Sequence, residues 1–231
     1  MQESDKTVRL YGCALLFGCI VLIVCGGLIK TWSQSAGKVN GVEPILSLEF
    51  ARSGSEIKTI TSNFSPTAIG ELKKILILDW IVIIPTYLLL LLFFTRRFRL
   101  RNPKYRRAFE MLVFACIGAV GISDCFENYF SWSALNLSES EARFWGSNLI
   151  FLSAGAKWSF LSMSALLLSF LLYVSDGWLY KFIAFLLLGT GFMGFAGLYN
   201  YHLFNVFMML LFWVTLLLGI AYLSFPKKFT R

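Results

Sequence analysis

Three ionisable residues, Asp79, Asp124 and Lys157, lie inside long apolar stretches of the sequence. Each lies 17 or 18 residues along the chain from a polar or basic residue that bounds its stretch. The three boundary residues are predicted to lie on the same side of the membrane. Those boundary residues are Arg96, Arg107 and Ser175. At about 1.5 Å per helical residue, all three lie about 26 Å from that boundary. Three separate helices would therefore bring acidic and basic side chains to one depth.

Charged side chains inside a membrane are rare because they are costly. An Asp or Lys at the bilayer centre costs about 2.5–3.5 kcal/mol on insertion scales, so such groups turn inward and pair. We predict that Lys157 lies between Asp79 and Asp124, with Glu127 hydrogen-bonded nearby. Two or three carboxylates around one ammonium leave negative charge that requires a proton or a cation. Such an imbalance is typical of a proton-handling or substrate-binding site.

Other polar residues accompany these three. Glu127 and Asn128 follow Asp124 by three and four residues, so they share its helical face. Pro85 removes a backbone hydrogen bond, and Tyr87 lies two residues further on; this combination can line a cavity, and ordinary bundle geometry is the open alternative. The candidate catalytic residues are Asp79, Asp124 and Glu127. The candidate binding residues are Lys157, Asn128, Tyr87, His202 and Glu49.

The composition requires elements that can position these residues in a membrane. The chain has 231 residues, of which 57% are hydrophobic and 15% charged, against about 45–50% and 25% in soluble domains. We predict an all-α membrane protein, a bundle of six transmembrane helices in a single transmembrane domain over residues 1–231. The predicted spans are about 11–29, 75–95, 108–126, 147–174, 182–198 and 204–225.

The segment 31–74 is the one sizeable stretch predicted outside the membrane. Apolar residues recur in it at helical spacing, starting near Pro44 and ending before Pro66. This predicts a short interfacial amphipathic helix at about 45–64, between spans 1 and 2. Its two interpretations, a cap on the bundle or a lid over a site, are both open.

Basic residues orient the spans. Thirteen Lys and Arg residues flank one side and seven the other, which places both termini in the cytoplasm of a multi-pass protein of the cytoplasmic (inner) membrane. Seven of the thirteen lie between Arg96 and Arg107, where each attracts anionic lipids by about 1 kcal/mol. This clustering does not indicate a nucleic-acid partner. An alternative is that the first span is a secretory signal cleaved near Ser33–Ala36.

Cysteine and histidine usage argues against a cofactor. All five cysteines fall inside apolar spans, which predicts small buried apolar side chains and no disulfide scaffold. With one histidine, neither a zinc cage nor a bis-histidine haem site is available. We expect no cofactor and no metal, and a metal held by carboxylates alone is the remaining alternative.

Four glycines in the fifth span indicate close helix packing. Gly189, Gly191, Gly194 and Gly197 let helix backbones approach each other, which is a main source of helix association in lipid.

Short motifs resemble a family of small bacterial multi-span membrane proteins. They are Leu48-Glu49-Phe50-Ala51, Leu78-Asp79 with Pro85 and Tyr87, Asp124-Cys125-Phe126-Glu127-Asn128, and Ala156-Lys157-Trp158. The resemblance covers Pro44 to Trp158 and leaves out the last two spans. It implies that the residues found by depth are the family's signature, and it implies no activity. Trp158 departs from the phenylalanine expected there.

These observations support three functional hypotheses. The first is binding or processing of a lipid-like or amphiphilic small molecule that enters from the outer leaflet. The second is a small proton- or cation-coupled transporter. The third is a non-catalytic membrane assembly subunit, in which the charges only fix helix register. The partners expected are membrane lipids and an amphiphilic small molecule, and a homo-oligomer is an open alternative.

Overall fold

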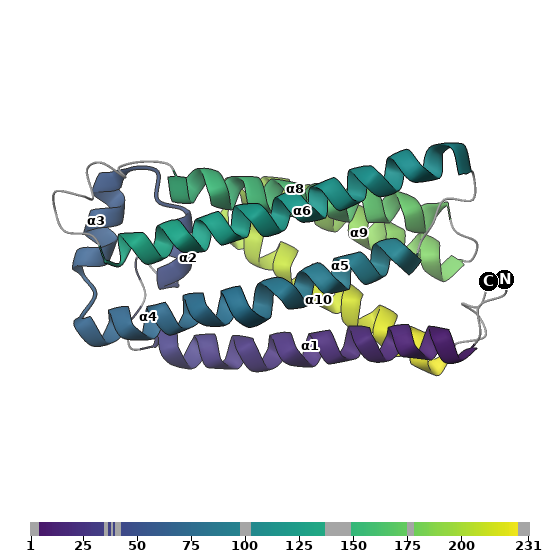
Figure 1. Cartoon of the computed structure of the whole chain (residues 1–231), viewed down its shortest axis with the longest axis horizontal. Coiled ribbons are helices and arrows are strands. Elements are labelled where there is room, and N and C mark those ends of the chain that lie inside the picture. Colours follow the sequence, from purple (N-terminus) through teal and green to yellow (C-terminus); the bar gives the residue numbers. More distant parts are fainter. Residues whose placement is uncertain are drawn as a thin grey trace. The chain divides into compact units, whose positions relative to one another are not determined.

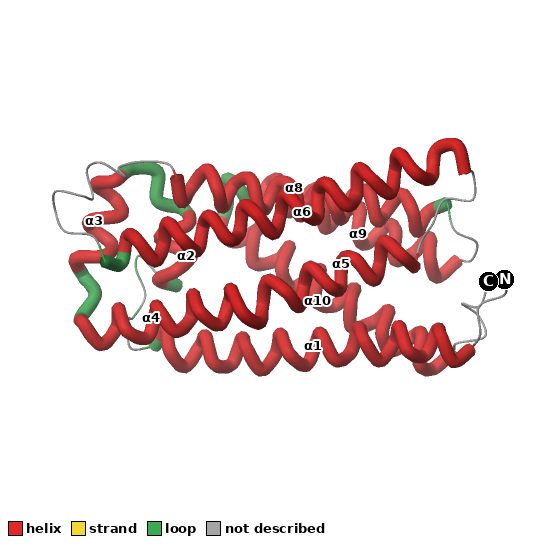
Figure 2. Tube along the Cα trace, in the orientation of Figure 1, coloured by secondary structure: helices red, strands yellow, loops and turns green. Residues whose placement is uncertain are grey.

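The computed structural model is all-α (Figures 1 and 2). It describes residues 5–34, 37, 39, 43–97, 103–136, 149–174 and 178–225. Helices and loops, and no strand, make up these ranges (Figure 2). Residues 98–102 of the basic loop predicted to attract anionic lipids lie outside the described residues.

Among the described residues, six helical stretches are long and apolar enough to cross a membrane, as predicted. The second consists of three consecutive elements, a helix, a π-helical turn and a second helix. The stretches are α1 (Asp5–Ser33), α4–η1–α5 (Pro66–Leu78, Asp79–Ile83, Ile84–Arg97), α6 (Pro103–Ala134), α8 (Leu149–Tyr173), α9 (Trp178–Gly197) and α10 (Tyr201–Ser224).

The second stretch begins earlier than the sequence predicted. Residues 66–74 were assigned to the outside segment, yet they form the first turns of α4. Ser65 caps this helix by accepting a hydrogen bond from the Ala68 N–H at 3.2 Å, and Pro66 occupies its first turn. Both residues favour helix initiation, so the helix begins at Pro66 and not at the apolar boundary.

The single amphipathic helix predicted at 45–64 is wrong. Two short helices, α2 (Pro44–Glu49) and α3 (Gly54–Ser62), replace it. Ser53 accepts a hydrogen bond from the Glu56 N–H at 3.2 Å, and the Glu56 carboxylate accepts one from the Arg52 N–H at 2.6 Å. This reciprocal arrangement resembles a capping box and starts a new helix at Gly54, so local capping overrides the longer periodicity.

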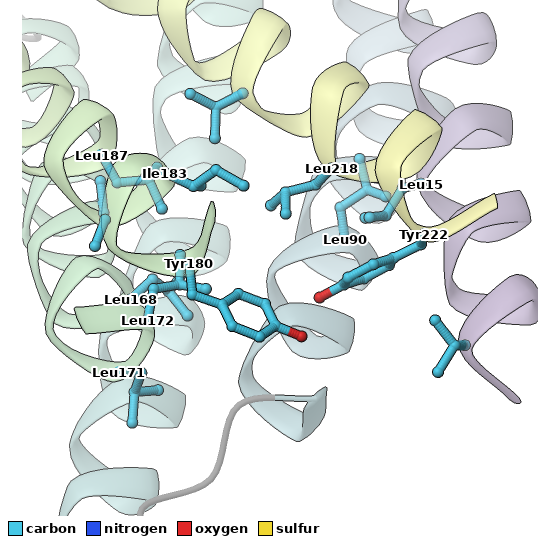
Figure 3. Close-up of a cluster of buried hydrophobic side chains, with 14 residues drawn as sticks. Leu15, Leu90, Leu168, Leu171, Leu172, Tyr180, Ile183, Leu187, Leu218 and Tyr222 are labelled. Atoms are coloured by element: carbon cyan, nitrogen blue, oxygen red, sulfur yellow. The ribbon is translucent and has the colours of Figure 1, made fainter. Parts of the chain in front are cut away.

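The chain divides into two compact units. Unit 1 comprises residues 1–22, 86–118 and 158–231, and unit 2 comprises 23–85 and 119–157. The core of unit 1 is built from α1, α5, α8, α9 and α10, with Leu15, Leu90, Leu172, Ile183 and Leu218 among its buried side chains (Figure 3). The core of unit 2 includes Leu48 of α2, Ile57 of α3 and Leu72 of α4.

Large apolar side chains also cover the outside of the spans. Phe17, Ile81, Phe126, Phe185 and Trp213 are all exposed. Helices with apolar surfaces and satisfied backbones suit lipid, whereas soluble monomers rarely expose contiguous apolar patches. The chain is therefore a multi-pass membrane protein.

The cysteines only partly match their prediction. All five are free, and Cys19, Cys25 and Cys116 are buried as expected. Cys13 and Cys125 are exposed, so the prediction is wrong for them. Both lie on outward faces of their spans, where an apolar thiol tolerates a hydrocarbon environment.

Candidate functional site

Unit 2 contains a buried group of ionisable side chains centred on Lys157 of α8. Its ammonium Nζ lies 2.5 Å from Glu127 Oε2, 3.1 Å from Asp124 Oδ1 and 3.8 Å from Glu49 Oε2. Asp124 and Glu127 belong to α6, and Glu49 ends α2. We call these residues, together with Asp79 and Asn128, the acid–lysine cluster.

The four ion-paired side chains are almost completely enclosed. Their exposed fractions are 6% for Lys157, 1% for Glu127, 4% for Asp124 and 7% for Glu49. Charges this deeply buried require partners with good geometry, because desolvation otherwise exceeds the Coulombic gain. The cluster is thus an ordered set of ion pairs and not a group of wet charges at the membrane edge.

Asp79 joins the cluster through a neutral partner. Asn128 Nδ2 donates a hydrogen bond to Asp79 Oδ2 at 2.5 Å. The sequence predicted Asp79 beside Lys157, but its described hydrogen bond is to this amide. Asn128 lies one residue after Glu127, so α6 supplies the partners of both Lys157 and Asp79.

The spacing on α6 explains how one helix supplies three cluster residues. Asp124, Glu127 and Asn128 occupy positions i, i+3 and i+4, which share one face, and all three are buried. The opposite face, with Ile122 and Phe126, is exposed. The helix therefore turns its polar face inward, as expected in lipid.

A π-helical turn positions Asp79. It runs from Asp79 to Ile83, and the Ile84 N–H donates to the carbonyl of Asp79, five residues back. Pro85 has no N–H to donate and its ring crowds the preceding turn, which favours such an irregular turn. Turns of this kind occur frequently at functional sites.

Glu49 reaches the cluster because α2 packs on the core of unit 2. Leu48 and Ala51, on either side of Glu49, are buried in that core. A residue of the segment between the first two spans thus contributes a carboxylate to a site made otherwise by spans. Sequence spacing alone gave no reason to place it next to Lys157.

Two of the predicted binding residues, Tyr87 and His202, stay predictions. Tyr87 is in unit 1, whereas every residue of the acid–lysine cluster is in unit 2. His202 lies in the first turn of α10, also in unit 1, and its side chain is outside the described part of the structure. Within the described residues, no group of three or more His, Cys, Asp and Glu side chains is arranged to hold a metal ion.

Sequence reasoning missed Ser131. Its side chain is fully buried in α6, and its hydroxyl has no hydrogen-bond partner among the residues that the structure describes. It follows Asp124 by seven residues and Glu127 by four, so it continues the cluster face of the helix. That spacing is visible in the sequence, but a serine in a helix usually bonds its own backbone, so the residue type alone does not indicate a site.

Comparisons with known protein families, with curated proteins and with solved structures found no match to this chain. The resemblance drawn from the short motifs therefore stays a prediction.

Replacing Asn128 with Ala should lower the free energy of unfolding by about 1 kcal/mol. The change leaves the Asp79 carboxylate without its amide donor, and single polar contacts between spans average about 0.6 kcal/mol, with a maximum near 1.7. Thermal unfolding in detergent micelles measures the effect. Ser133→Ala is the matched control on α6, because Ser133 is half-buried and its hydroxyl donates to the Tyr129 carbonyl of its own helix. Equal effects of the two changes would contradict a role for Asn128 in holding Asp79.

Proposed function

We propose that this protein binds, and through its carboxyl groups processes, a lipid-like or amphiphilic small molecule whose head group reaches the acid–lysine cluster. The observation that carries the proposal is the enclosure of Lys157 by Glu49, Asp124 and Glu127 within 4 Å. Ionisable groups at membrane depth are costly, and their usual justification is a functional site.

We further propose that the protein lies in the cytoplasmic (inner) membrane with both termini in the cytoplasm. The excess of Lys and Arg on one side of the spans supports this orientation. The cluster then belongs to the outer leaflet, and a ligand enters from that leaflet.

Each cluster residue has a role in this proposal. Asp79, Asp124 and Glu127 are the candidate acid–base or cation-holding groups. Lys157 holds the carboxylates together. Its ammonium already faces three carboxylates of the chain, so it is a poor receptor for an anionic head group. Asn128 orients Asp79.

Native mass spectrometry of the protein, purified in mild detergent, tests the proposal. We expect the wild-type chain to retain an amphiphile. In Asp124→Asn the signal of the protein–amphiphile complex should be at least tenfold weaker. Glu71→Gln is the matched control, because Glu71 is a carboxylate of α4 that pairs with Lys74 near the surface. Absence of any retained or re-added amphiphile on a folded wild-type protein would overturn the proposal.

A second candidate function is proton- or cation-coupled transport. It is favoured by the presence of four carboxyl groups beside one ammonium in the cluster. Reconstitution in liposomes with an internal pH-sensitive dye distinguishes the two: a proton flux that disappears in Glu127→Gln supports transport, and tight lipid retention without flux supports binding.

A further inference from the structure

The hydroxyl of Ser131 has no hydrogen-bond partner among the residues that the structure describes. Some helical serines donate to the carbonyl four residues earlier, as Ser133 does to Tyr129 at 2.9 Å and Ser164 to Phe160 at 2.9 Å. Ser162 of α8, like Ser131, has no partner among the described residues, but Ser131 alone of the two lies on α6, the helix that supplies three cluster residues. Ser131 makes no such bond among the described residues and is fully buried. Because an unsatisfied buried hydroxyl costs about 1–3 kcal/mol, a ligand atom that bonds it would recover stability.

Ser131 lies beside the carboxylate that is held by an amide. It follows Asn128 by three residues on α6, so the two side chains are neighbours on one face, about one turn apart. Asn128 in turn donates to Asp79 Oδ2. The helical spacing therefore places Ser131 about one turn from the amide that holds the Asp79 carboxylate. Asp79 is half-buried and starts the π-helical turn.

The charges select the sign of the ligand. An anionic group at this position would face the carboxylates of Asp79, Asp124 and Glu127, and the ammonium of Lys157 is already engaged by carboxylates. A cation with N–H donors matches both acceptors, since charge-assisted N–H hydrogen bonds to carboxylates are the stronger kind.

We propose that the head group bound at the acid–lysine cluster carries a protonated primary amine, which donates hydrogen bonds to the Asp79 carboxylate and to Ser131 Oγ. This inference rests on the proposed function and names its substrate class. Two kinds of molecule carry such an amine: an aminolipid such as phosphatidylethanolamine, and a soluble amine such as ethanolamine.

Lipid titrations of the full-length protein in detergent test the amine, read out by native mass spectrometry. The probes share acyl chains and differ in the head group: phosphatidylethanolamine, phosphatidylcholine, which keeps the positive charge but lacks N–H donors, and anionic phosphatidylglycerol. We expect phosphatidylethanolamine to bind at least tenfold more tightly than either of the others. Competition by soluble ethanolamine at concentrations equal to the lipid would identify a free amine as the source, and its failure to compete would identify the lipid.

Variants locate the amine. Asp79→Asn should abolish the preference for phosphatidylethanolamine, Ser131→Ala should weaken its binding several-fold, and Glu71→Gln should change neither. Equal binding of the three lipids by the wild-type protein, which needs no variant to fold, would overturn the amine inference and leave the proposed function standing. An unchanged preference in folded Asp79→Asn would also overturn it. Binding of no lipid at all would remove the proposed function itself.

Discussion

Replacing Lys157 with Met is expected to lower the free energy of unfolding by about 3–5 kcal/mol, the cost of removing one partner from a buried ion pair. The change leaves Glu49, Asp124 and Glu127 enclosed without the ammonium that now lies within 4 Å of each. Thermal unfolding in detergent, followed by size-exclusion chromatography, measures the loss together with the yield of folded protein.

Lys74→Met is the matched control for this prediction. Lys74 pairs with Glu71 at 2.9 Å, yet its side chain is 56% exposed, and surface pairs contribute about 0–1 kcal/mol. An effect of Lys157→Met no larger than that of Lys74→Met would mean that the acid–lysine cluster does not hold unit 2 together.

Double-mutant cycles separate an architectural cluster from a binding site. Coupling to Lys157 should decrease from Glu127 to Asp124 to Glu49, following the distances of 2.5, 3.1 and 3.8 Å. One outcome is that the double variant Lys157→Met/Glu127→Gln regains most of the stability that Lys157→Met alone loses. If that double variant still fails to retain an amphiphile, the pair serves binding. Recovery of both stability and binding would assign the pair to architecture alone.

The pairing of Lys157 with Asp124 and Glu127 could be predicted from sequence because depth and helical face are both local properties. Counting along the chain gives the depth, and the spacing between Asp124 and Glu127 gives the face. Which residue each side chain meets depends on how the helices rotate about their axes, which sequence spacing does not determine. For this reason the hydrogen bond from Asn128 to Asp79 was not predicted from the sequence.

The contribution of Glu49 required the course of the segment between the first two spans. That course depends on the break between α2 and α3, which Ser53 and Glu56 set by capping. The six spans themselves were predictable because a chain in lipid must satisfy its backbone within each helix. The ends of the spans were less predictable, because a capping residue such as Ser65 decides where a helix begins, and hydropathy does not.

Replacing Gly194 with Leu is the second large-effect prediction, and it concerns the packing of unit 1. A Cβ at Gly194 would collide with the side chains of Ser162 and Phe207, from α8 and α10. Overpacking a tight contact costs about 1–3 kcal/mol and occasionally more. We expect a loss of about 3 kcal/mol here, because helix association in lipid depends on such close approaches.

The matched control lies on the same helix. Gly189 was predicted from sequence to share this packing role, but a Cβ there meets nothing within 4 Å. Gly189→Leu should therefore leave the thermal unfolding midpoint of the detergent-solubilised protein nearly unchanged, while Gly194→Leu lowers it. The comparison keeps helix propensity and added hydrophobicity constant, so the difference isolates the contact of α9 with α8 and α10. Similar midpoints for the two variants would show that small residues in α9 reflect composition and not close packing.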